Sequence, residues 1–172
     1  AAEDLAVNCL GHGETSPLYK RLVQDSGLAN NCSSSTMFMS KGGAHFIRVV
    51  FPHKNLDKVF KVLSDTMDEV AHKGLARAEA QRIKNQYLSS KIYEMESLES
   101  YAFSLGHGYA QNGNVECEEE FIGRIKATRL SEVNEALRSL TKRPIHACLQ
   151  VPKNEDLASA RKKVGALVSR LS

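Results

Sequence analysis

The chain has 172 residues, of which 42% are hydrophobic and 25% charged, and its formal net charge is +3. The basic residues form no stripe with interleaved aromatics, which argues against a nucleic-acid-binding protein. No apolar run approaches the roughly 20 residues of a membrane span, and no targeting signal precedes the first helix, so the compartment stays unknown.

The spacing of apolar residues, together with cap and turn residues, predicts the secondary structure. In chain order the predicted elements are a helix Ala2–Leu10, a short helix Pro17–Gln24 that stops at Gly27, a hairpin of strands Leu28–Ser40 and Ala44–Phe51, a helix from Asn55 or Asp57 to Lys73, a helix from Arg77 to about Glu94, a helix Ser97–Tyr109 interrupted at Gly106-His107-Gly108, helices Glu116–Lys126 and Thr128–Leu140, a strand Ile145–Val151, and a helix Leu157–Leu171.

These elements predict one α+β domain over residues 1–172, with a mostly antiparallel β-sheet covered on one face by several helices. Three strands make a thin sheet for so many helices, and the chain begins inside a helix. We therefore expect that the domain is a fragment of a longer chain, and that at least one strand comes from upstream of Ala1 or from a partner.

A search for chemistry finds little. The zinc-ligand signatures His-Glu-x-x-His and His-x-x-Glu-His are absent, and the cysteines make no Cys-x-x-Cys pair. Cys9 and Cys148 lie among apolar neighbours and are predicted to be buried. A Leu-Gly-His-Gly string occurs twice and suggests a metal site of His12, Glu14 and His107. Both strings also suit helix ends, which need only glycine, so we predict no metal or catalytic residue, and the sequence does not identify substrate-binding residues.

The order of several motifs resembles the pitrilysin/insulinase-type zinc metallopeptidases. Leu10-Gly-His-Gly-Glu-Thr-Ser-Pro-Leu-Tyr, followed by Leu22 and Gly27-Leu28-Ala29, is similar to the family pattern LG-x-G-x-x-S-x-L…L…GLA. Gly74-Leu75-Ala76-Arg77-Ala78-Glu79 with Lys84 resembles its G-x-x-x-x-E-x-x-x-x-K turn and helix. The stretch Phe121–Val133 is similar to the segment that precedes the family's closing strand.

This resemblance implies a LuxS/pitrilysin-like fold and a non-catalytic domain of a zinc metalloendopeptidase. It also implies that zinc belongs to an upstream catalytic domain, and that the partners are that domain, or another subunit, and unfolded peptides. In the family's last domain an Arg and a Tyr on this loop assist the zinc site, and Val23 and Asn30 stand at those places. The resemblance is therefore greatest to the second domain, which follows the catalytic one.

Two other functions stay open. A structural or assembly subunit could share the fold without activity, as the missing Arg and Tyr suggest. A free-standing peptide-binding module could use an exposed sheet edge. In each case the segment by itself is predicted to be inactive.

Overall fold

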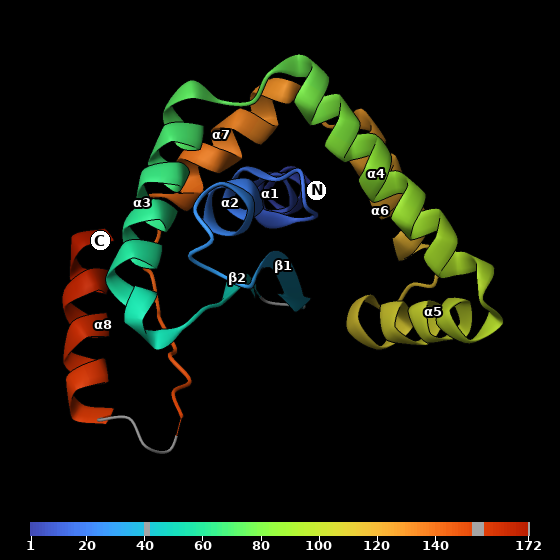
Figure 1. Cartoon of the computed structure of the whole chain (residues 1–172). Coiled ribbons are helices and arrows are strands. Elements are labelled where there is room, and N and C mark those ends of the chain that lie inside the picture. The colour runs from blue at the N-terminus through green and yellow to red at the C-terminus, as the bar shows by residue number, and fades with distance from the viewer. Residues whose placement is uncertain (40–41, 153–156, 172) are drawn as a thin grey trace.

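Helix α1 (Ala2–Gly11) lies at the centre of the molecule, with the β-hairpin on one side and helix α7 (Leu130–Leu140) on the other (Figure 1). The structure is a computed structural model that describes residues 1–39, 42–152 and 157–171. Every residue from Asp4 to Gly11 is buried, so α1 is a core helix and not a surface helix with one apolar stripe. Its buried polar side chains are paired, since Asn8 Nδ2 donates to Asp4 O at 2.8 Å.

Strands β1 (Asn31–Met39) and β2 (Gly42–Val50) form the antiparallel hairpin that the sequence predicts. At the start of β1, Cys32 and Ser34 are buried while their neighbours are exposed, as expected for a strand with one face against a helix. The Ser34 hydroxyl donates to Val7 O of α1 at 2.7 Å, which joins the hairpin directly to the central helix.

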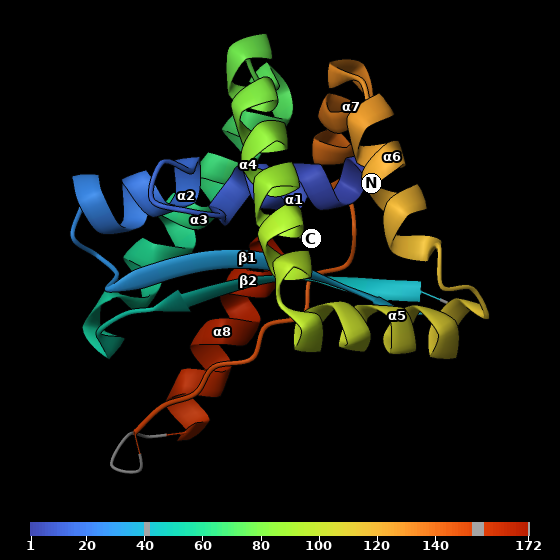
Figure 2. The same cartoon turned by 90° about the vertical axis from the view of Figure 1, so that its right-hand side faces the viewer.

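The other elements surround this centre. They are α2 (Pro17–Tyr19) continuing into the π-helix η1 (Lys20–Asp25), the 3-10 helix η2 (His53–Asn55), α3 (Leu56–Lys73), α4 (Arg77–Glu96), α5 (Leu98–Asn112), α6 (Cys117–Ala127) and α8 (Leu157–Leu171). Figure 2 shows α1 above the hairpin and α8 below it. The fold is α+β, as predicted, with most helices on one side of a small antiparallel sheet.

Two sequence predictions about these elements are wrong. Residues Ile145–Val151 are extended but form no strand, because a strand requires a ladder partner and neither β1 nor β2 pairs with them in the described part of the chain. Gly106-His107-Gly108 does not interrupt α5, which continues to Asn112. The glycine that ends this helix is Gly113, which has a left-handed φ of 70°.

An ion-pair cluster holds the start of α1 against the hairpin and against the turn that follows α7. Glu3 Oε2 lies 3.2 Å from His45 Nε2 of β2 and 3.3 Å from Arg143 Nη1, and Arg143 Nη2 binds the other carboxylate oxygen. The pKa of Glu3 is lowered, and the hydrogen bond from Arg143 is the main cause. This cluster joins three segments that are distant in the sequence.

We predict that Gly11→Ala destabilises the domain. A Cβ at Gly11 would lie 3.1 Å from both Cβ and Oγ of Ser34, so α1 and β1 would have to move apart at a cost of about 1–2 kcal/mol. Gly123→Ala is a matched control, because a Cβ there meets nothing within 4 Å and alanine favours a helix by about 1 kcal/mol. Chemical denaturation should show a lower free energy of unfolding for Gly11→Ala and not for Gly123→Ala. Equal effects of the two substitutions would contradict the close packing of α1 against β1.

We also predict that Glu3→Gln lowers the free energy of unfolding at pH 7 by up to about 1 kcal/mol, the range of partly exposed ion pairs. Because folding lowers the pKa of Glu3, its contribution is complete above the ordinary value of 4.5 and is lost as the pH falls through the lowered pKa. The difference in the free energy of unfolding between Glu3→Gln and the natural protein should therefore vanish in acid. Glu135→Gln, at an exposed position of α7, provides the control. A difference that does not depend on pH would argue against the ion pair.

Candidate functional site

The exposed large apolar side chains gather in two places. One group lies on the hairpin, and the other lies on the second half of α4, on α5 and just after it; we call this second region the α4–α5 arm, residues 91–115. The hairpin group comprises Met37, Phe38, Met39, Phe46 and Val50, and the arm group comprises Ile92, Tyr93, Leu98, Tyr101, Phe103, Tyr109 and Val115. Exposed apolar patches often mark a place where another molecule binds.

Helix α5 is the most exposed helix of the arm. Leu98 is 84% exposed and Phe103 is 73% exposed, and Gly108 is the one residue of α5 with a described exposure that is buried. An apolar helix with so little burial would not be stable as a lone amphipathic helix, because helices in proteins depend on packing of an apolar face. Its sequence and its environment therefore disagree, and contact with another molecule would resolve the disagreement.

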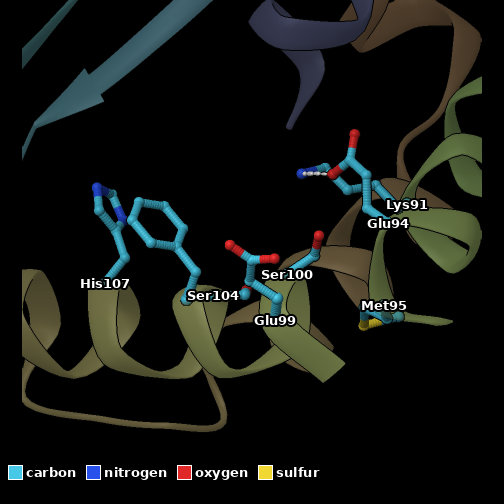
Figure 3. A pocket seen from close by; sticks show the side chains of 8 residues that line it. Lys91, Glu94, Met95, Glu99, Ser100, Ser104 and His107 are labelled. Carbon is cyan, nitrogen blue, oxygen red and sulfur yellow. Dashed lines mark hydrogen bonds and ion pairs between the residues drawn. The ribbon is translucent and has the colours of Figure 1, made fainter. Parts of the chain in front are cut away.

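A cavity of about 500 Å³ opens where α4 meets α5 (Figure 3). Its lining residues are Lys91, Glu94 and Met95 of α4 and Glu99, Ser100, Phe103, Ser104 and His107 of α5. Lys91 Nζ and Glu94 Oε2 form an ion pair at 3.0 Å, and the rings of Phe103 and His107 stack with centroids 5.8 Å apart. Charged side chains and a stacked pair of rings therefore line the same cavity.

Aromatic rings join the hairpin to α6 and to the middle of α4. Phe38 of β1 meets Phe121 of α6 edge-to-face with centroids 6.3 Å apart, and Phe121 meets Tyr87 of α4 at 6.5 Å. These contacts hold the hairpin against α6 and against the half of α4 that precedes the arm, and Figure 1 shows the hairpin under the arch that α3 and α4 form.

The suggested metal residues are not brought together. His12 and Glu14 are exposed in the loop after α1, and this loop contacts α4 through Thr15, whose hydroxyl accepts from Arg82. His107 lies on α5, beyond the other end of α4; the helical rise between Arg82 and Glu96 alone is about 20 Å. Over residues 1–39, 42–152 and 157–171 no three His, Cys, Asp or Glu side chains group in a way that could hold a metal ion. The described residues therefore do not fit a zinc site.

One polar cluster has the order of a nucleophile, base and acid. Thr36 Oγ1 lies 3.1 Å from His45 Nδ1, and His45 Nε2 lies 3.2 Å from Glu3 Oε2. The Arg143 guanidinium, however, binds the Glu3 carboxylate and lies 3.3 Å from the same imidazole nitrogen. Neither described cavity is lined by these residues. We assign the cluster a structural role.

The burial predicted for Cys9 is confirmed, and the burial predicted for Cys148 is wrong. Cys9 is buried as predicted, and burial raises the pKa of its thiol to about 12; Cys32 is also buried and its pKa rises to about 11. Cys148 is exposed, because the extended segment that carries it is not covered on that side. Thiols with raised pKa are poor nucleophiles and poor metal ligands at neutral pH.

Val23 and Asn30 stand where a catalytic helper pair would be expected in the family's last domain. Val23 is half-buried and packs against the core from η1. Asn30 precedes β1, and its backbone N–H donates to Val50 O at 2.7 Å. Neither side chain can supply a cation or a phenol.

Comparison with known proteins identifies the family. Residues 1–87, half of the chain, match the family described as the peptidase M16 inactive domain. The chain belongs to the peptidase M16 inactive-domain family. It is 26% identical over 144 residues to an uncharacterized zinc protease of Mycobacterium tuberculosis. This alignment covers 83% of the chain and 33% of that relative, so the chain spans about a third of the length of the curated relatives it matches.

Solved structures share the fold of this M16 inactive domain. A peptidase M16 inactive domain from Pseudomonas fluorescens has a TM-score of 0.70 at 19% identity, with 80% of this chain and 33% of that chain covered. A protease from Helicobacter pylori has a TM-score of 0.69 at 20% identity, with 80% and 33% covered. The metallopeptidase-like, non-catalytic α+β fold predicted from the motifs is thus confirmed.

None of the described helices of this M16 domain is long and apolar enough to cross a membrane.

The exposed apolar surface is not among the features that were predicted from the sequence. The signal that could have found it is in α5, where Phe103 lies on the opposite face of the helix from Leu98 and Tyr101, although a helix with one buried side concentrates apolar residues on one stripe.

We predict that a small alkylating reagent modifies Cys148 rapidly in the native protein and leaves Cys9 and Cys32 unmodified until the domain unfolds. The reason is burial, which both blocks access and raises the pKa of the two inner thiols. Mass spectrometry of peptides after timed labelling gives the rates. Native labelling of Cys9 as fast as that of Cys148 would contradict the buried position of α1.

Proposed function

We propose that this chain is the non-catalytic domain of a zinc metalloendopeptidase. In this proposal it forms part of a chamber that encloses unfolded peptides, and a catalytic domain upstream in the same protein, or in a partner subunit, holds the zinc ion and performs hydrolysis. The observation that carries the proposal is the match of residues 1–87 to the peptidase M16 inactive domain. The length of the relatives and their description as zinc proteases support it.

The exposed apolar side chains of the hairpin and the arm support a role in enclosing peptides. Unfolded peptides expose apolar side chains and unpaired backbone groups, and this side of the domain offers both apolar surface and a strand edge. The domain itself contributes no acid, base or metal ligand in this proposal. Its contribution to catalysis is to hold the substrate and to exclude water.

The proposal is tested in the complete natural protein. We expect the double variant Leu98→Ser and Phe103→Ser to lower kcat/KM for unfolded peptides about tenfold. A tenfold change corresponds to about 1.4 kcal/mol, which is less than the free energy that two buried apolar side chains would contribute to peptide binding. The zinc content should not change. Lys162→Ser, at an exposed position of α8, is the matched surface control. An unchanged kcat/KM in the double variant would remove the arm from substrate binding.

Two measurements test the non-catalytic role. The purified 172-residue segment should hydrolyse no peptide and retain no stoichiometric zinc after dialysis; tightly held zinc would revive the candidates His12, Glu14 and His107. The complete open reading frame, or that of a partner subunit, should contain a His-x-x-Glu-His helix. If neither contains one, the enzyme form of the proposal is excluded.

A structural or assembly subunit is the second candidate, favoured by Val23 and Asn30 in place of an Arg and a Tyr. Co-purification of a stable membrane complex with no peptidase activity would support it. A free-standing peptide-binding module is the third candidate, favoured by the unpaired edges of the two-stranded sheet. It requires that the segment by itself binds unfolded peptides.

A further inference from the structure

Helices α4, α5 and α6 form a unit that we call the α4–α6 lobe, residues 77–127. Figure 1 shows these three helices on the side of the arch away from α3 and α8. Helices α5 and α6 pack mainly against each other and against α4, and the first half of α4 packs against α1 and the loop after it. The main chain enters and leaves the lobe through two short connections, residues 74–76 and 128–129. Short connections at the ends of helices are where hinges occur in proteins.

The lobe has few buried residues that hold it against the rest of the domain. Of residues 77–110, 113–116 and 119–127, the buried ones are Ile83, Gly108 and Ile125. In α1, by contrast, every residue from Asp4 to Gly11 is buried. Segments with few buried apolar contacts open at a lower free-energy cost than the core of a protein. The lobe is therefore expected to open more readily than the core around α1.

The first connection is held in place by a side chain from outside the lobe. Gly74 has φ 69° and ψ −178°, a conformation that essentially only glycine adopts. Asn134 of α7 accepts a hydrogen bond from the backbone N–H of Leu75 at 2.8 Å through its Oδ1. Its amide group also lies 3.0 Å from the place where a Cβ of residue 74 would be. Asn134 thus fixes the direction in which the chain enters α4.

The second connection is tied to the lobe itself. Thr128 and Arg129 have extended backbone between α6 and α7. Lys84 of α4 donates through Nζ to Thr128 O at 3.0 Å and also to Lys126 O. Because Lys84 and Lys126 both belong to the lobe, these bonds keep the end of α6 against α4. A rotation of the lobe would therefore take place after Thr128, at Arg129.

Two further contacts between the lobe and the rest of the domain are of kinds that break and form again readily. Arg82 Nη1 donates to Thr15 Oγ1 at 2.7 Å in an exposed position, where water can replace either partner. Phe121 of α6 meets Phe38 of β1 edge-to-face with centroids 6.3 Å apart, and this contact involves no polar group. Opening of the lobe would therefore leave no buried donor or charge unpaired at either contact.

Cys9 is covered by the lobe, whereas Cys32 is covered by other elements. Cys9 lies on α1, and burial is the main cause that raises the pKa of its thiol, while the charges of Glu79 and Arg82 on α4 also act on it. Cys32 lies at the start of β1, at the opposite end of this strand from Phe38, and β1 packs mainly against β2, α1, α2 and η1. Opening of the lobe would expose Cys9 and leave Cys32 buried.

We propose that residues 77–127 open and close as one lobe, with hinges at residues 74–76 and at Arg129, and that Asn134 holds the lobe closed. Opening carries the α4–α5 arm away from the hairpin. In the peptide-enclosing role proposed above, this movement admits and releases peptides, and this consequence alone rests on that role. The opening itself is a property of the fold and is tested without any peptidase activity.

Timed thiol labelling of the complete natural protein tests the opening. The reaction is followed for much longer than Cys148 requires, and the rate at each cysteine is divided by its rate in the unfolded protein. We expect Cys9 to react at least about tenfold faster than Cys32, because opening of the lobe costs less free energy than unfolding of the core. Mass spectrometry of peptides gives both rates. Equal rates would show that only unfolding of the whole domain exposes Cys9, and would overturn the proposal.

Asn134→Ala tests the side chain that holds the lobe closed. We expect it to raise the labelling rate of Cys9 about tenfold, because only the closed state loses the hydrogen bond from Leu75. Asn114→Ala is the matched control, since it removes a bond of the same length, from the N–H of Glu116 at 2.8 Å, inside the lobe. This bond is present in the open and the closed state, so the rate should not change. An unchanged rate in Asn134→Ala, or equal changes in both variants, would overturn the proposal.

Glu3→Gln separates opening of the lobe from unfolding of the domain. The partners of Glu3 are His45 and Arg143, which lie outside the lobe, so the open and the closed state both keep these contacts. The substitution should raise the labelling rate of Cys32 and leave that of Cys9 unchanged. A parallel increase at both cysteines would overturn the proposal. If Asn134→Ala does not fold, this variant and the natural protein still decide the case, and failure here leaves the proposed function to its own test by kcat/KM.

Discussion

The close contact between α1 and β1 is the constraint on which the rest of the structure depends. Gly11 and Ser34 allow the helix and the strand to approach until an added Cβ would lie 3.1 Å from its neighbour, and the Ser34 hydroxyl bonds to Val7 O. Because α1 is buried throughout, α7, α4 and α2 can pack around it from other directions. The motif that begins at Leu10 includes Gly11, so this part of the motif meets a packing requirement.

Much of the fold follows from local signals. The hairpin, the helix from Leu56 to Lys73 and the glycine stop at Gly27 were predictable because apolar spacing and positive-φ glycines act within a few residues. The strand predicted at Ile145–Val151 was wrong because alternating apolar residues indicate only a tendency to be extended, and a strand also needs a partner. The helix interruption predicted at Gly106-His107-Gly108 was wrong because glycine permits a helix to end without requiring it.

The candidate site was less predictable than the fold. His12, Glu14 and His107 were suggested by a repeated string, but proximity in space depends on the course of α4, which no short motif encodes. The exposed arm was missed because apolar residues are normally assigned to a core. A chain is normally expected to bury its own apolar surface, whereas α5 leaves Leu98 and Phe103 exposed.

The end of the hairpin has a chemical character that bears on selectivity. Met37 and Met39 are 47% and 56% exposed, and methionine side chains are flexible and polarizable, so they adapt to apolar partners of different shape. If peptides bind here as proposed, a surface of this kind would discriminate weakly between their sequences. It is also sensitive to oxidants, because conversion of a thioether to a sulfoxide makes it polar. In the proposed peptide-binding role, broad recognition and vulnerability to oxidation would therefore be two effects of the same pair of sulfur atoms.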